Sequence, residues 1–180
     1  MLADRSIEFK RESGEVGTES VGSDGLYEAA EVPGSGAVLL RTRVNTGDDL
    51  FALAVPGDET DLVQNIHSYS DLVARNWFAS NGLDIEAVFE SPGEISAVPS
   101  LAALRALEQS VSQITTDVQD DYNLNNINLF NDSYFADGSG IDQFLISNPV
   151  FINNGVINIC LLYTSPSPRD ATLSRMPSSA

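Results

Sequence analysis

Apolar and polar positions alternate in short runs over the first third of the chain, which predicts β-strands. Residues 6–10 (SIEFK) and 37–44 (AVLLRTRV) alternate, and residues 50–55 (LFALAV) form an apolar run typical of a strand buried on both faces. Turn-forming segments rich in Gly, Pro, Asn and Asp separate these runs. We therefore predict about four antiparallel strands in residues 1–56. So small a sheet needs a partner layer, either the helices that follow or strands upstream of residue 1.

The period of the pattern becomes helical in residues 65–89. Apolar side chains recur there every three or four residues, Ser68 or Ser70 can cap the first turn, and the Asn-Gly pair at residues 81–82 can end the helix. This helix carries no reactive group and is predicted to be the hub on which the neighbouring segments pack. The hub residues are Tyr69, Asp71, Val73, Arg75 and Trp77.

A second amphipathic helix is predicted to start after Ser100, with an apolar seam at three- and four-residue spacing. The seam consists of Leu101, Leu104, Leu107, Val111, Ile114 and Val118. Residues 120–142 are rich in Asn, Asp and Gly and predict an ordered loop, with a short helix in residues 141–146. Residues 150–159 (VFINNGVINI) predict a hairpin.

These elements define an α+β fold, with a partial antiparallel β-sandwich of about four strands, a helical subdomain and a C-terminal β-hairpin. The expected boundaries are residues 1–56 for the sandwich module, 57–119 for the helical subdomain, and 120–159 for the Asn/Asp-rich loop and hairpin.

Residues 160–180 are predicted to be a non-native tail. The peptide CLLYTSPSPRD at residues 160–170 is the translation, from its second base, of a transposase adapter used in short-read DNA sequencing. Residues 174–180 (SRMPSSA) match the translated flow-cell sequence, and the three residues between them occupy the place of the index. We therefore expect the natural sequence to be interrupted after Ile159 and the chain to be a fragment of a longer protein.

The charge of the chain narrows the range of partners. It contains 26 acidic and 9 basic residues, for a formal net charge of -17. Nucleic acids and anionic membrane surfaces are bound by Lys and Arg, so this balance argues against both. Hydrophobic residues make up 42% of the chain, too many for intrinsic disorder, and no apolar run is long enough to span a membrane. The single cysteine, Cys160, lies in the tail, so neither a disulfide nor a cysteine metal site is expected.

Few residues suggest catalysis. His67 is the only histidine, and it lacks a second histidine or a cysteine with which to form a metal site. We expect it to make a local hydrogen bond or to be exposed. Carboxylates are paired at residues 48–49, 58–61 and 120–121, all in predicted loops where solvated charge is the default. We predict no catalytic residue, no cofactor site and no enzymatic activity.

One acidic segment allows a metal site. Residues 131–142 (NDSYFADGSGID) resemble part of a calcium loop, since hard cations need several converging oxygens and a glycine at the bend. The candidate ligands are Asp132, Asp137, Ser139 and Asp142. The EF-hand spacing is not met, and a plain Asx/Gly turn is the alternative interpretation.

Three segments together resemble a protein family. Residues 14–44 (GEVGTESVGSDGLYEAAEVPGSGAVLLRTRV) are similar to the end of a carboxypeptidase-regulatory-like or bacterial Ig-like β-sandwich, as found in bacterial surface lipoproteins. Residues 50–78 are similar to the strand and helix that follow such modules, although Ser68 stands where a proline is expected. Residues 129–145 (LFNDSYFADGSGIDQFL) resemble the element that closes their helical part.

The resemblance implies a non-enzymatic, extracytoplasmic module at the cell surface or in the periplasm that acts in adhesion or scaffolding. Its partner would be a protein or a glycan. One alternative is a noncatalytic accessory domain of a secreted hydrolase, and another is a calcium-dependent binding module.

Overall fold

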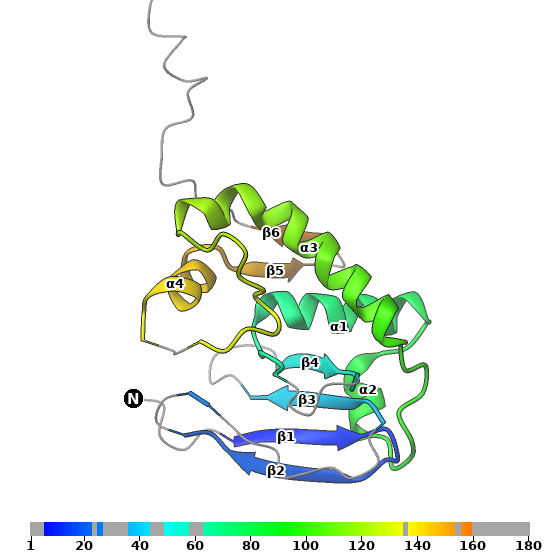
Figure 1. Ribbon diagram of the computed structural model, residues 1–180. Helices are drawn as coiled ribbons and strands as arrows, with labels where there is room; N and C mark the ends of the chain where they lie inside the picture. Colours follow the sequence, from blue (N-terminus) through cyan, green and yellow to red (C-terminus); the bar gives the residue numbers. More distant parts are fainter. Residues whose placement is uncertain are drawn as a thin grey trace, which may run out of the picture.

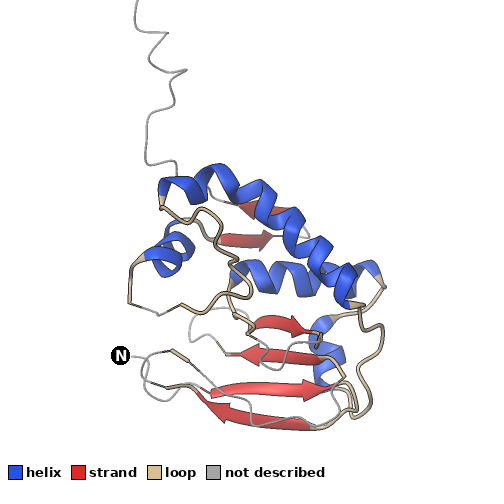
Figure 2. Cartoon of the chain, in the orientation of Figure 1, coloured by secondary structure: helices blue, strands red, loops and turns tan. Residues whose placement is uncertain are grey.

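The computed structural model describes residues 6–22, 25–26, 36–43, 49–57, 63–134, 137–153 and 156–159. Its elements are strands β1 (Ser6–Arg11), β2 (Val16–Ser20), β3 (Val38–Thr42) and β4 (Leu50–Ala54), helices α1 (Ser68–Ser80), α2 (Ile85–Glu90), α3 (Leu101–Asp121) and α4 (Gly140–Ser147), and strands β5 (Val150–Asn153) and β6 (Val156–Ile159) (Figure 1). The first four strands form one antiparallel sheet in the order β2-β1-β3-β4, and β5 pairs with β6 (Figure 2). The predicted α+β class is confirmed. The tail, residues 160–180, lies outside the described residues.

Helices supply the partner layer on one face of the sheet. Side chains of β3 and β4 on this face pack with α1 and α2 in a cluster that we call the sheet core. Its buried members are Ala37, Leu39, Phe51, Leu53, Ala74, Phe78, Ile85, Val88, Phe89 and Ile95. The opposite face of the sheet buries Ile7, Phe9, Leu40 and Ala52. Of the two partner layers considered for the sheet, the structure therefore provides the helices.

A second cluster, the helical core, lies on the other side of α1. It joins α1 to α3, α4 and the loop between them, and Tyr69 at its centre is fully buried. The buried members are Tyr69, Leu72, Val73, Leu104, Val111, Val118, Leu124, Leu129, Phe130, Ile141 and Phe144. Since α1 also contacts β4 and β5, it is the element that connects both cores.

The two cores divide the predicted hub face of α1. Tyr69 and Val73 belong to the helical core, whereas Trp77 packs on the edge of the sheet core and is only half-buried. Its indole N–H donates to the Ala97 carbonyl at 2.5 Å. At 100° per residue, a four-residue spacing drifts by 40° per step, which carries Trp77 away from the line of Tyr69. The fully buried aromatic residue in this part of α1 is Phe78.

In α3 the seam runs along a slightly different line from the predicted one. Leu104, Val111 and Val118 are buried as expected, but Ile114 is 58% exposed and Thr115 is fully buried in its place. Six residues of α3 are buried, at positions 104, 108, 111, 115, 118 and 119. The first five of these positions alternate spacings of four and three, which is closer to the helical period than the spacing of the predicted apolar seam. The Thr115 hydroxyl bonds to backbone carbonyls within α3, so its burial leaves no polar group unpaired.

The loop after α3, α4 and the hairpin follow the predictions. Asn123 and Asn126 adopt positive φ of 58° and 67°, a conformation that asparagine tolerates better than most residues. α4 covers the predicted residues 141–146, and the hairpin pairs Val150 with Ile159. No helix in the described residues is long and apolar enough to cross a membrane.

Gly17 is a testable point of close packing in the sheet. It lies opposite Phe9 in the β1–β2 register, and a Cβ at Gly17 would stand 2.2 Å from Phe9 Cζ. We expect Gly17→Ala to lower the free energy of unfolding by about 1–3 kcal/mol, since the buried ring must move. Urea denaturation followed by circular dichroism measures this change. Gly93→Ala is the control, because nothing lies within 4 Å of its Cβ position; equal midpoints for the two variants would contradict the prediction.

Candidate functional site

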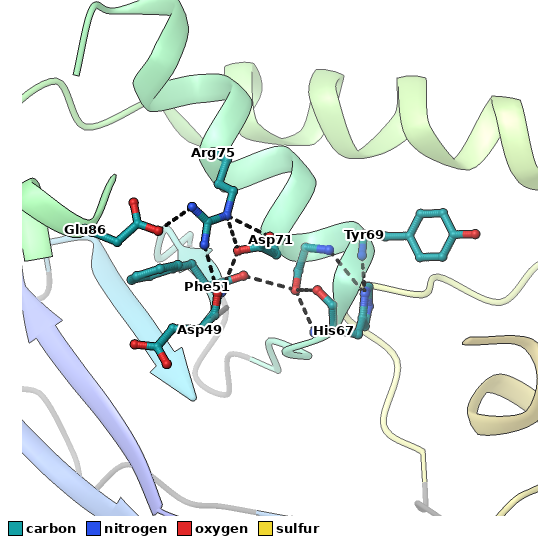
Figure 3. A network of polar contacts seen from close by, with 8 residues as sticks. Asp49, Phe51, His67, Tyr69, Asp71, Arg75 and Glu86 are labelled. Carbon is teal, nitrogen blue, oxygen red and sulfur yellow. Dashed lines mark hydrogen bonds and ion pairs between the residues drawn. The ribbon is translucent and has the colours of Figure 1, made fainter. Parts of the chain in front are cut away.

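Buried polar side chains lie along α3 (Glu108, Thr115 and Gln119) and just after α4 (Asn148), and two further groups of them are the candidate sites for chemistry. One lies at the start of α1 and includes Ser70 together with His67 and Asp71, which Figure 3 shows. The other lies between the sheet and the C-terminal end of α2, around Lys10 and Arg41.

His67 caps α1 with its side chain. It has extended backbone angles, and its Nδ1 atom accepts hydrogen bonds from the backbone N–H groups of Tyr69 and Ser70, each at 3.2 Å. Ser70 completes a capping box, because its hydroxyl oxygen accepts from the His67 N–H at 2.9 Å. The cap is therefore His67, and neither Ser68 nor Ser70 takes the predicted position. An imidazole nitrogen serves here in the role usually filled by a Ser, Thr, Asp or Asn oxygen.

The contacts of His67 define its tautomer. Since Nδ1 accepts, Nε2 carries the hydrogen and donates to the Leu129 carbonyl at 2.9 Å. The side chain is only 5% exposed, and burial lowers the pKa of His67 to about 4 against the opposing effect of the Leu129 carbonyl. The ring is therefore neutral at pH 7. The expected local hydrogen bond is present, and the residue is buried.

Asp71 and Arg75 link α1 to the sheet and to α2. The Asp71 carboxylate accepts from the Phe51 N–H of β4 at 3.0 Å and from Arg75 Nε at 2.9 Å. Arg75 also donates to Glu86 of α2 at 2.5 Å and to the Asp49 carbonyl at 2.8 Å (Figure 3). Burial raises the pKa of Asp71 more than its bonds to Arg75 and Phe51 lower it. Arg75 thus connects three elements through one planar group.

Serine, histidine and aspartate stand close together here, but they do not form a catalytic triad. A triad requires the serine hydroxyl to donate to an imidazole nitrogen, and the other nitrogen to face the carboxylate. The Ser70 hydroxyl instead donates to the His67 carbonyl at 2.8 Å. Both ring nitrogens are bonded to backbone groups, and Asp71 pairs with Arg75. The arrangement organises the helix terminus.

The second polar cluster lies under the end of α2. Lys10 Nζ donates to the carbonyls of Val88 and Ser91 at 2.7 and 2.6 Å, and to the Ser91 hydroxyl at 2.9 Å. Arg41 bonds Glu8 across the strands at 2.8 Å and also bonds Glu90. Lys10 thus bonds carbonyls at the C-terminal end of α2, where the helix dipole favours positive charge, whereas Arg41 is bonded to carboxylates.

The Lys10–Ser91 contact resembles a serine–lysine dyad only in composition. In such a dyad a neutral amine takes the proton of the serine hydroxyl. Burial lowers the pKa of Lys10, with the Glu90 charge opposing the shift. However, all three N–H donors of the ammonium have acceptors, and the Ser91 hydroxyl donates to the Val88 carbonyl at 2.8 Å. The geometry favours a charged lysine that holds α2 on the sheet.

Sequence reasoning missed Lys10 and Arg41. Both are charged residues that alternate with apolar residues in their strands, a pattern that predicts a solvent-facing side chain. They are nevertheless only 0% and 6% exposed. The available signal was that Lys10 is the only lysine in a strongly acidic chain. The face that each strand turned to the helices could not be known before the sheet was paired.

The predicted calcium ligands lie in two separate turns. Asp137 accepts from the Ser139 N–H at 2.9 Å and hydroxyl at 2.6 Å, and Asp142 accepts from the Gly138 N–H at 2.7 Å. Asp132 instead accepts from the Asn128 N–H at 2.8 Å. Hydrogen bonds from Ser139 hold the pKa of Asp137 below its usual value. Across the ranges that the structure describes, no three His, Cys, Asp or Glu residues are grouped so that they could hold a metal ion. Calcium binding stays a prediction.

The structure describes some of the paired carboxylates that the sequence places at residues 48–49, 58–61 and 120–121. Asp49 provides its carbonyl to Arg75, and its carboxylate lies 3.9 Å from Arg41 Nε. Asp120 and Asp121 are exposed at the C-terminal end of α3. Asp48 and residues 58–61 lie outside the described residues.

Comparison with known protein families, with curated proteins and with solved structures found no match in any of the three.

Proposed function

We propose that this chain is a non-enzymatic module of an extracytoplasmic bacterial surface protein, and that it acts in adhesion or scaffolding. The observation that carries the proposal is that both buried polar clusters are occupied in joining elements of the fold. His67 and Ser70 cap α1, Arg75 ties α1 to α2 and β4, and Lys10 holds the end of α2.

The placement of the basic residues supports the same proposal. Each lysine and arginine in the described ranges has a polar or acidic contact within the fold. Lys10 donates to carbonyl and hydroxyl oxygens, and the arginines, Arg11, Arg41, Arg43, Arg75 and Arg105, form ion pairs with carboxylates. Together with the net charge of -17, this leaves an excess of carboxylates, which suits a partner that is neutral or basic. A glycan or a basic protein surface fits this charge, whereas nucleic acids and anionic lipids do not.

Co-sedimentation tests the proposal. The purified chain is incubated with washed bacterial envelopes and, separately, with insoluble polysaccharides, and is then centrifuged over a range of salt concentrations. We expect saturable sedimentation with at least one of these materials. A chain that stays in the supernatant with all of them would contradict the adhesion role, and turnover of an ester, peptide or glycoside substrate would contradict the non-enzymatic assignment.

A calcium-dependent binding module is the second candidate, favoured by the closeness of Asp137 and Ser139, just before α4, to Asp142 in the first turn of that helix. If it is correct, millimolar calcium raises the melting temperature of the chain, and Asp137→Asn abolishes the increase. Magnesium at the same concentration controls for ionic strength. An unchanged melting temperature in calcium removes this candidate.

A further inference from the structure

A junction between two distant segments forms around His67. Residues 63–70, which lead into α1, contact residues 128–132 of the loop after α3. Asn65 donates its backbone N–H to the Phe130 carbonyl and its side-chain amide to the carbonyls of Leu129 and Asp132, each at 2.8 Å. His67 adds the Nε2–H bond to the Leu129 carbonyl. The loop is therefore held by backbone hydrogen bonds that depend on the position of the α1 N-terminus.

His67 is enclosed at this junction by groups that leave no place for a second ring proton. The ring of Phe130 lies 5.6 Å from the imidazole and that of Tyr69 6.1 Å, measured between centroids. A proton on Nδ1 would point at the Tyr69 and Ser70 N–H groups, which are donors themselves. It would also place a positive charge at the positive end of the α1 dipole.

The charged groups near the junction do not offset such a charge. On α3, Arg105 bonds the Asn131 side chain of the facing loop and is paired with the Glu108 carboxylate at 2.7 Å. On α1 itself, Asp71 is bonded to Arg75 and to the Phe51 N–H of β4. On the facing loop, the Asp132 carboxylate is bonded to the Asn128 N–H, so only its backbone carbonyl takes part in the junction. β4 contributes a neutral acceptor, the Phe51 carbonyl, which lies 3.4 Å from the Ser70 hydroxyl.

We propose that His67 is an acid-sensitive latch: protonation of its imidazole releases the N-terminal cap of α1 and undocks residues 128–132, while the sheet core stays folded. The bonds lost are the two that Nδ1 accepts, and the ring must then leave its buried site, which breaks the bond to the Leu129 carbonyl. This inference goes beyond the proposed function and does not depend on it.

The direction of the pH effect follows from linkage. The pKa of His67 in the folded chain, about 4, lies below its ordinary value of 6.5, so the opened or unfolded chain takes up the proton first as the pH falls. The stability that the neutral cap contributes is complete above about pH 6.5 and is lost between pH 6.5 and pH 4. The population of the open junction should therefore rise roughly 100-fold between pH 7.5 and pH 4.5.

Hydrogen exchange of the full chain, corrected for the intrinsic pH dependence of exchange, tests the latch directly. We expect the Tyr69 and Ser70 amides to lose protection at pH 4.5 relative to pH 7.5. The Ala103 amide is the internal control, since it is bonded to the non-titrating cap Ser100 of α3 at 3.2 Å. Retained protection at Tyr69 and Ser70 would overturn the proposal, and so would equal loss at Ala52, which pairs with Leu40 of β3, because the opening would then be global.

The His67→Asn variant distinguishes the effect of the imidazole on the pH dependence of opening from the effects of nearby carboxylates. Asparagine is a good cap that does not titrate. Burial raises the pKa of Asp71 and Glu108. Because the folded chain then protonates these carboxylates first as the pH falls, they increase its stability toward acid pH, whereas His67 decreases it. The difference between the wild-type and variant pH profiles therefore isolates His67. We expect the acid-induced opening to disappear in the variant, whereas parallel profiles would refute the latch.

Nuclear magnetic resonance of the His67 ring in the unaltered chain keeps the proposal testable if the variant does not fold. The expected result is an Nε2–H tautomer that persists well below pH 6. A midpoint near 6.5 would show that the ring is not held as a cap.

Discussion

Phe78→Ala is expected to lower the free energy of unfolding by about 3–5 kcal/mol, and Trp77→Ala by only about 1–2 kcal/mol. The residues are neighbours on α1, but Phe78 is 0% exposed in the sheet core and Trp77 is half-buried at its edge. Removing the Phe78 ring leaves a cavity between α1 and the strands. Removing the Trp77 ring takes away contacts on one side and the bond to the Ala97 carbonyl.

Urea denaturation followed by far-UV circular dichroism measures both changes. Fluorescence is unsuitable, because Trp77 is the only tryptophan of the chain. Phe78→Leu serves as a milder control that keeps part of the volume and should cost less than the alanine variant. If Trp77→Ala proves as costly as Phe78→Ala, then the assignment of Trp77 to the edge of the core is wrong.

Lys10→Met is expected to lower the free energy of unfolding by about 2–4 kcal/mol. Methionine has a similar length and no donor, so the Ser91 carbonyl loses its bond to Nζ, and the Val88 carbonyl keeps only the bond from the Ser91 hydroxyl. A buried polar group that loses its partner costs about 1–3 kcal/mol. The loss is partly offset because a buried charge no longer has to be desolvated.

The matched control is Arg43→Met. Arg43, directly after β3, is also a cation, but its side chain is 70% exposed and its contact with Glu8 is 3.4 Å long. Surface pairs of this kind contribute about 0–1 kcal/mol. Denaturation midpoints at pH 7 compare the two variants, and a Lys10→Met midpoint equal to that of Arg43→Met would mean that Lys10 does not hold α2 on the sheet.

The cations within the fold also reduce electrostatic repulsion between its carboxylates. In a chain this acidic, each internal cation relieves repulsion among carboxylates as well as making its own bonds. Arg41 shows this most fully: it pairs with Glu8 and Glu90, lies 3.9 Å from an Asp49 carboxylate oxygen, and stacks 4.1 Å from the Phe89 ring centroid. Glu90 in turn has its pKa lowered, first by the hydrogen bond from Arg41. The sheet and α2 are therefore joined by charge as well as by apolar contact.

Much of the fold could be predicted from residue patterns. The strands at residues 6–10 and 50–55, the helix after Ser100, and the hairpin at residues 150–159 were each predicted to within a few residues. These signals are local, because alternation, helical period and Asn-Gly turns reflect the geometry of the backbone where they occur.

The polar site could be predicted only in part. His67 was expected to make a local hydrogen bond, but its role as the cap depends on a chain direction that turns Nδ1 toward α1. The partner of Nε2, Leu129, is separated from it by 62 residues. No local pattern encodes such a contact, because it exists only after the loop has packed on the start of α1.

Local period and composition were sufficient to predict which segments form strands and helices, the α+β class and the acidic character of the chain. Packing between distant segments, in contrast, sets the division of α1 between two cores, the deeper burial of Phe78 than of Trp77, and the place of Lys10 inside the fold. Burial depends on which faces meet. The face of a strand is set by pairing with segments far away in the chain, and the side of a helix that becomes core is set by the layers packed on both sides of it.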